Sequence, residues 1–107
     1  MQHPVEDFME TLDRDAQARI AAAIEKLRVR NVHAGEPLVK HIDGKIWELR
    51  QATRSGAFRV LYFMFVGRQI VLLHAFQKKT RQTPRREVTI AQARMERIRA
   101  SLEGQRR

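Results

Sequence analysis

The sequence predicts an α+β fold in which an N-terminal helix hairpin is followed by a twisted antiparallel sheet of three strands or more and by a C-terminal helix. Apolar residues recur at helical spacing before residue 31 and after residue 83, and strand-like runs fill the region between residues 46 and 76. The turns between these runs are short enough to require antiparallel hairpins. We expect one domain over residues 1–107, with the helix hairpin at 1–30, the sheet at 46–76 and the C-terminal helix at 84–103.

The first two expected helices are short and amphipathic. Proline is favoured in the first turn of a helix, and apolar residues follow Pro4 at helical spacing, so the first helix is expected from about Pro4 to Leu12. The second is expected over Ala16–Arg30, with Asp13 or Asp15 as its N-cap. The segment Asn31–Gly44 contains two Gly and one Pro and has no apolar period, which predicts a connection between the helices and the sheet.

Three strand-like runs follow this connection. The first, Ile46–Thr53, alternates apolar with polar residues, which should place Arg50 on the face away from Trp47. The second, Ala57–Val66, is β-branched and aromatic on both faces and therefore belongs in the middle of the sheet. The third, Gln69–Phe76, follows after a two-residue turn and should form a hairpin with the second.

A final helix is expected to start at Pro84, with Thr83 as its cap. One stripe of this helix is apolar and comprises Val88, Ala91, Met95, Ile98 and Leu102. Its other faces carry arginines, which makes the C-terminal region strongly basic.

Positive charge is concentrated after residue 44. The chain has a formal net charge of +9, and residues 45–107 hold fifteen Lys and Arg against four Asp and Glu. A basic surface on a folded domain favours polyanionic partners. The absence of cysteine excludes disulfides, Cys nucleophiles and iron–sulfur sites, and no HxH, HExxH or DxD spacing supports a metal, so we expect no cofactor. The acidic N-terminal stretch and the short apolar runs predict a cytoplasmic protein without a membrane span.

Several sequence blocks carry a family resemblance. Ile46–Arg50 (IWELR), Phe58–Tyr62 (FRVLY), Leu72–Thr80 (LLHAFQKKT) and Thr83-Pro84 stand in this order along about half the chain. Together they resemble the phage-derived, HigB-like branch of the RelE/ParE toxin superfamily. The resemblance implies a RelE-like fold and cleavage of mRNA on the ribosome. It also implies a cognate antitoxin, often a helix-turn-helix protein, as the neutralising partner.

One departure from the family pattern concerns the N-terminus. Members usually begin with a further strand before the first helix, and Pro4 leaves no room for one here. The sequence therefore predicts either a start that lacks this strand or a sheet with an exposed edge, where other chains could pair.

Cleavage by a ribose 2′-OH needs a general base, cations on the phosphate and a proton donor for the departing 5′-oxygen. The candidate catalytic residues are Arg59, Lys78, Lys79 and His74. Arg59 is the first choice for gripping the scissile phosphate with its two-pronged guanidinium, and the alternative is an ion pair with Glu48 across the sheet. Repulsion between Lys78 and Lys79 favours loss of a proton, as a general base requires, and the alternative is a solvated pair that attracts RNA.

The remaining candidates are less specific. His74 alternates with apolar residues, so a histidine satisfied at the edge of the core is favoured over an acid or base. Arg50 is either a second phosphate ligand or part of a surface ion pair. The other residues expected to bind RNA phosphates are Lys45, Arg81, Arg85 and Arg86.

Three functions are compatible with these patterns. The first is a metal-independent, ribosome-dependent mRNA endonuclease that inhibits translation. The second is a ParE-like DNA gyrase inhibitor, which would not need the cations around Arg59 and Lys78. The third is a degenerate, non-toxic module that binds nucleic acid or a partner.

Overall fold

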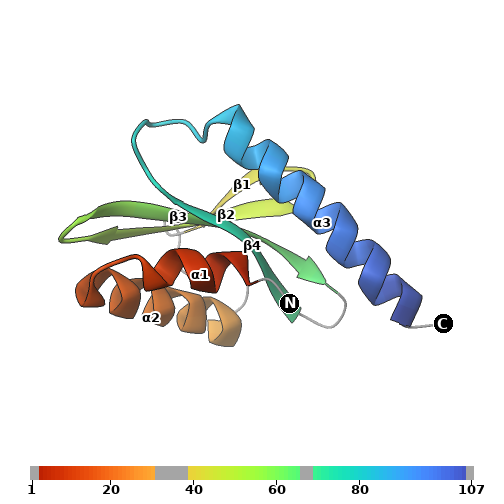
Figure 1. The fold of residues 1–107 in the computed structure, drawn as a ribbon, viewed down its shortest axis with the longest axis horizontal. Coiled ribbons are helices and arrows are strands. Elements are labelled where there is room, and N and C mark those ends of the chain that lie inside the picture. The colour runs from red at the N-terminus through yellow and green to blue at the C-terminus, as the bar shows by residue number, and fades with distance from the viewer. Residues whose placement is uncertain (1–2, 31–38, 66–68, 106–107) are drawn as a thin grey trace.

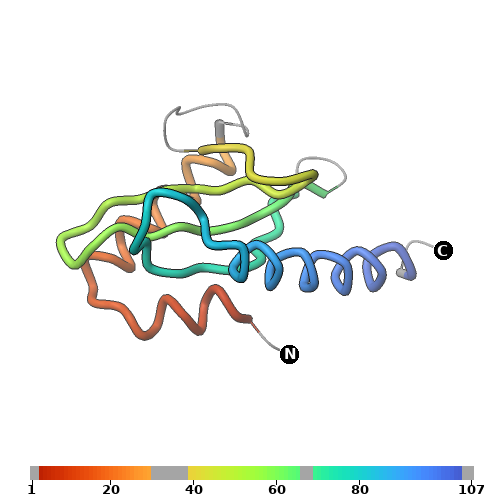
Figure 2. The backbone as a smooth tube through the Cα atoms, turned by 90° about the horizontal axis from the view of Figure 1, so that it is seen from above, coloured from red at the N-terminus to blue at the C-terminus, as the bar shows by residue number. Residues whose placement is uncertain are grey.

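The described residues of the chain form a four-stranded sheet between two layers of helix (Figure 1). The structure is a computed structural model and describes residues 3–30, 39–65 and 69–105. Its elements are α1 (Pro4–Glu10), α2 (Arg14–Arg30), β1 (Val39–Asp43), β2 (Ile46–Thr53), β3 (Gly56–Phe65), β4 (Gln69–Gln77) and α3 (Arg85–Gln105). The strands are antiparallel in the order β1-β2-β3-β4, as the view in Figure 2 shows, and the α+β prediction is confirmed.

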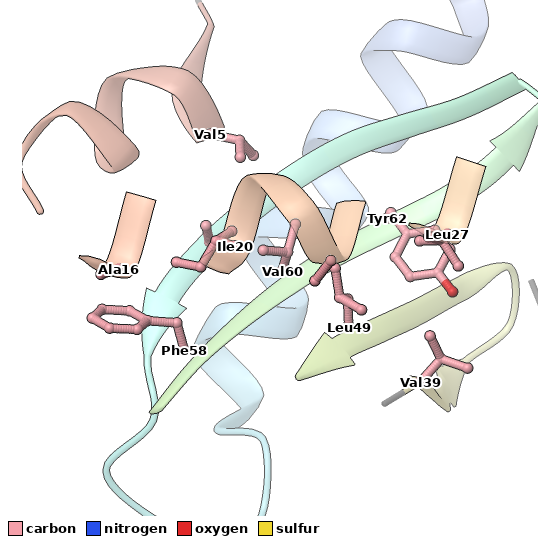
Figure 3. Close-up of a cluster of buried hydrophobic side chains, with 11 residues drawn as sticks. Val5, Ala16, Ile20, Leu27, Val39, Leu49, Phe58, Val60 and Tyr62 are labelled. Carbon is pink, nitrogen blue, oxygen red and sulfur yellow. The ribbon is translucent and has the colours of Figure 1, made fainter. Parts of the chain in front are cut away.

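The two faces of the sheet bury separate apolar clusters. On one face Leu49, Val60 and Tyr62 pack against Ile20 and Leu27 of α2 (Figure 3). On the other face residues from β2, β3 and β4 pack against α3, and this cluster comprises Ile46, Leu61, Phe63, Leu73, Phe76, Ala91 and Met95. Strand β3 contributes to both clusters, which explains why its sequence is apolar on both sides. It lies between β2 and β4, in the middle of the sheet as predicted.

The interpretation of Asn31–Gly44 as a connection was wrong for its last part. Residues 39–43 form β1, which pairs with β2 and places Val39 in the core beside α2. Gly44, with φ 54°, makes the tight turn between the two strands. The dipeptide Asp43-Gly44 is itself a strong hairpin signal and could have revealed the strand. Residues 31–38 lie outside the described part of the chain, as do the predicted strand end Val66 and the two turn residues after it.

The helix boundaries follow from their caps. Helix α1 ends at Glu10, two residues earlier than predicted, and α2 begins at Arg14 because Asp13 caps it, accepting a hydrogen bond from the Ala16 amide at 2.8 Å. Helix α3 begins at Arg85, and the Pro84 carbonyl accepts the first helical bond from Val88 at 3.3 Å. The N-cap is therefore Pro84, and the prediction that Thr83 caps this helix was wrong.

Two aspartates at the start of α2 stabilise the fold when they are ionised, and this contribution to the free energy of unfolding is lost in acid. The backbone N–H of Ala16 lowers the pKa of Asp13, and the backbone N–H of Arg54 in the β2–β3 turn lowers the pKa of Asp15, both from an ordinary value of 3.8. A carboxyl whose pKa is lower in the folded state stabilises the fold when ionised, so its contribution is lost as the pH falls through and below 3.8. We expect Asp13→Asn/Asp15→Asn to lower the free energy of unfolding at pH 7 and to flatten its decrease in acid.

Chemical denaturation at a series of pH values measures this effect. Asp7→Asn, which removes a carboxylate from α1, is the matched control for the loss of a negative charge. A double variant that loses stability in acid as steeply as the wild type would contradict the assignment.

Candidate functional site

A buried ion pair occupies the face of the sheet toward α3. Arg59 on β3 is 1% exposed and Glu48 on β2 is fully buried. Nη1 of Arg59 donates to Oε2 of Glu48 at 3.3 Å and to the hydroxyl of Thr83 at 2.8 Å. The structure therefore has the ion pair that the sequence left open as the alternative for Arg59. The guanidinium that was expected to grip a phosphate is enclosed by protein groups instead.

The same two residues fasten the loop that follows β4. Nη2 of Arg59 donates to the carbonyls of Thr80 at 3.2 Å and Arg81 at 2.6 Å. The hydroxyl of Thr83 donates to the Glu48 carboxylate. Charge-assisted hydrogen bonds of this kind are stronger than neutral ones. Residues 80–83 are thus held against the sheet by four hydrogen bonds through three groups, the Thr80 carbonyl, the Arg81 carbonyl and the Thr83 hydroxyl. The Nε of Arg59 finds no acceptor among the described residues.

Arg50 continues this network to the surface. It stands directly opposite Arg59 in the register of β2 and β3, and its Nε donates to Oε1 of Glu48 at 2.8 Å. The carboxylate therefore bridges two guanidinium groups that would otherwise repel each other. The Arg50 side chain is 36% exposed, whereas that of Arg59 is buried. Of the two cations, Arg50 is the one that solvent or a ligand can reach.

The predicted lysines lie at the start of the anchored loop. The amide of Lys78 donates to the carbonyl of Ala57 at 2.7 Å, which extends the pairing of β3 and β4 by one residue. Lys78, Lys79 and Arg81 are all exposed. We use the name cationic loop surface for Arg50, Lys78, Lys79 and Arg81. Its loop backbone is bonded to Arg59, and Arg59 pairs with Arg50 in the sheet.

The other predicted phosphate ligands are Lys45, Arg85 and Arg86, and none of them is part of the cationic loop surface. Lys45 is in the β1–β2 turn, about 16 Å along the strand from Arg50 at the usual rise per residue. Arg85 and Arg86 are exposed in the first turn of α3, where Arg85 lies 3.7 Å from Asp43. The structure thus joins Arg50 to the loop and places Lys45 at a separate point.

His74 fastens α3 to the sheet. Its Nδ1 lies 3.1 Å from Nη1 of Arg94, and its Nε2 lies 3.0 Å from Oε1 of Glu87. Arginine can only donate, so Nδ1 accepts the bond from Arg94, and the N–H at Nε2 donates a hydrogen bond to the Glu87 carboxylate. Both ring nitrogens are used, the side chain is 15% exposed, and the ring stacks on Phe76 at 5.6 Å. This is the satisfied histidine at the core edge that the sequence favoured.

Glu48 and Thr83 are the important residues that sequence reasoning did not place in the site. Glu48 was expected only as the alternative ion-pair partner of Arg59, although it shares a strand face with Arg50 and that face meets Arg59 across the sheet. Thr83 gave a misleading signal, since a threonine before proline is also typical of a helix start. Among the described residues, no helix combines the length and apolar character of a bilayer span, and no three metal-ligating side chains gather at one point.

Comparison with protein families identifies the chain. A family model described as "Phage derived protein Gp49-like (DUF891)" matches residues 7–96. The chain belongs to this Gp49-like family. It is a family of RelE-like, toxin-like proteins, and the match includes Glu48, Arg59, Thr83 and the whole cationic loop surface. No curated protein matches the Gp49-like chain.

Proposed function

We propose that this Gp49-like protein is a HigB-like toxin that cleaves mRNA on the ribosome and so inhibits translation. The observation that carries the proposal is the cationic loop surface, in which the carbonyls of Arg81 and the neighbouring Thr80 are fastened to a buried ion pair in the centre of the sheet. Catalysis gains most from charges that are already oriented before the substrate arrives. A surface loop with four hydrogen bonds to buried groups meets that requirement better than a free loop.

The chemistry assigned to this surface is transfer of a phosphodiester to the neighbouring ribose oxygen. The 2′-oxygen forms a bond to phosphorus while the bond from phosphorus to the 5′-oxygen breaks, which leaves a 2′,3′-cyclic phosphate and a 5′-hydroxyl. Lys78 or Lys79 takes the proton from the 2′-OH, and a second cationic donor protonates the 5′-oxygen. Arg50 and Arg81 stabilise the charge on the phosphate, and these side chains perform the steps without a cofactor.

In this proposal Arg59 is a positioning residue. Its guanidinium donates hydrogen bonds to Glu48, Thr83 and two loop carbonyls, so its role is to fix the loop backbone. This differs from the phosphate-gripping role expected from the sequence. His74 likewise supports α3 and takes no part in the proton transfers.

A chain of 107 residues offers little surface for recognising an mRNA, so in this proposal the ribosome presents the mRNA to it. Single-stranded RNA is recognised through extended contacts, and a small basic surface reads little sequence by itself. Contacts with ribosomal RNA phosphates would hold the protein while the ribosome presents the mRNA, and binding should weaken steeply with salt. The implied partners are the ribosome, mRNA and a neutralising antitoxin, with the cytoplasm as the place of action.

Induction in bacterial cells tests the proposal against the alternatives. We expect translation to stop soon after induction, with discrete new mRNA 5′ ends inside translated codons and unchanged DNA supercoiling. Lys78→Ala/Lys79→Ala, produced at the same level, should permit growth. Intact mRNA with altered supercoiling would replace the proposal with gyrase inhibition, and normal growth of cells that make the wild-type protein would contradict toxicity altogether.

A further inference from the structure

A groove of about 550 Å³ lies between the first turn of α1, the middle of β4 and the second half of α3. Sites that bind small ligands or anchor side chains usually measure about 300–1,000 Å³, so this groove is large enough to be occupied. Its apolar lining includes Leu72 and Leu73 of β4 and Ile98 and Leu102 of α3. No residue of the cationic loop surface lines it, so it is a separate feature of the molecule.

The groove exposes one continuous face of α3. The residues that α3 contributes are at positions 94, 97, 98, 101 and 102, which is the i, i+3, i+4, i+7, i+8 spacing of a single helix face. In both Figure 1 and Figure 2 the second half of α3 runs beyond the end of the sheet. Ile98 and Leu102 on this face are only partly buried. A face with this spacing is what a second helix packs against.

The charges at the rim favour an acidic occupant. Arg97 is exposed and makes no ion pair within the described part of the chain. Arg94 is fixed at the rim by its bonds to the Leu73 carbonyl at 2.9 Å and to His74. Glu6 is the one carboxylate against these two guanidinium groups among the described lining residues. Complementary charge at the rim of an apolar groove selects the partner and speeds its association.

We propose that this groove binds an acidic amphipathic helix of a partner protein. The helix lies along the face of α3 from Arg94 to Leu102, which is about 13 Å long at 1.5 Å per residue and matches two to three turns. Apolar side chains of the partner at i, i+3 or i+4 and i+7 enter the groove, and its carboxylates face Arg97. The inference stands without RNA cleavage. If the protein is a toxin, the groove is where its antitoxin would dock, away from the cationic loop surface.

Peptide selection on the full-length protein tests the inference. A phage-displayed library of random 16-residue peptides is panned against the immobilised wild-type chain, and enriched peptides are synthesised for fluorescence anisotropy. We expect enriched peptides to carry apolar residues at helical spacing with Asp or Glu on the flanks. Arg97→Glu and Leu102→Glu should each weaken their binding by about tenfold or more, equivalent to at least 1.4 kcal/mol. Arg81→Glu, the matched charge reversal on the cationic loop surface, should leave the affinity within a factor of two.

Several results would overturn the inference. These are failure to enrich any peptide, enriched peptides without the acidic amphipathic pattern, and binding that falls with Arg81→Glu but not with Arg97→Glu. Dimerisation of the wild type that Leu102→Glu abolishes would assign the groove to a second copy of the chain instead. Melting curves show whether Leu102→Glu is folded, and Arg97→Glu, an exposed substitution, repeats the test without that concern. Wild-type protein that binds such peptides but cuts no mRNA would refute the proposed function alone.

Discussion

Glu48→Ala is expected to lower the free energy of unfolding by about 3–5 kcal/mol, the usual cost of removing one partner from a buried ion pair. The carboxylate is fully buried and binds Arg50, Arg59 and Thr83. Without this carboxylate the Arg59 guanidinium remains buried and stands opposite Arg50 across the strands, with no negative charge between the two cations. For a domain of this size each kcal/mol corresponds to about 4–8 °C in melting temperature, so the loss is large in a thermal scan.

Two further variants test whether the loss of stability comes from the broken buried ion pair. Glu25→Ala removes an exposed carboxylate that pairs with Arg28 on α2, and it should change stability by less than about 0.5 kcal/mol. Glu48→Leu/Arg59→Met replaces both buried charges with apolar side chains and should regain more than half of the lost stability. That double variant should still cut mRNA poorly, because the loop carbonyls have lost their anchor. Equal destabilisation by Glu48→Ala and Glu25→Ala would show that the buried pair does not support the fold.

Lys78→Ala/Lys79→Ala is expected to lower the rate of mRNA cleavage by about 10²–10³-fold or more, since removal of a single charge-stabilising donor commonly has that effect. Both side chains are exposed, so the free energy of unfolding should stay within about 0.5 kcal/mol of the wild type. Cleavage of a defined mRNA by purified protein and programmed ribosomes measures the rate, and chemical denaturation measures the stability.

The matched control removes the same charge from the other side of the sheet. Lys26→Ala/Arg28→Ala takes two positive charges from the part of α2 where Leu27 packs, on the face of the sheet opposite α3. If the proposed assignment is correct, this variant retains the wild-type rate apart from a small change in salt dependence. A similar loss in both double variants would mean that net charge, and not the cationic loop surface, governs activity.

Local patterns predicted most of the fold. The stripe of α3 buries Val88, Ala91 and Met95 as its spacing indicates, and the apolar sequence of β3 gave its central place in the sheet. Strand β1 was not predicted from the sequence because five residues are too few to show a period in a segment that also contains Gly35, Pro37 and Gly44. For β1, the two-residue turn signal Asp43-Gly44 was more informative than the composition of the segment.

Long-range contacts explain why the site was harder to predict. An arginine is long enough to reach the surface or to turn inward, and Arg59 turns inward because Thr80, Arg81 and Thr83 supply acceptors from 21 to 24 residues away. The sequence of that loop has no periodicity from which these contacts could be predicted. His74 illustrates a second difficulty, since the strand irregularity between β3 and β4 places both Leu73 and His74 toward α3 and breaks the simple alternation.

The chemical nature of the cleaved ends tests the central claim most directly. Purified protein is incubated with ribosomes stalled on a defined mRNA, and each new end is examined for a 5′-hydroxyl and a 2′,3′-cyclic phosphate by ligation before and after kinase treatment. We predict ends that can be ligated only after 5′-phosphorylation, formed by the wild type with ribosomes and almost absent with Lys78→Ala/Lys79→Ala. New ends that already carry a 5′-phosphate, or equal cutting by that variant, would contradict cleavage by the cationic loop surface.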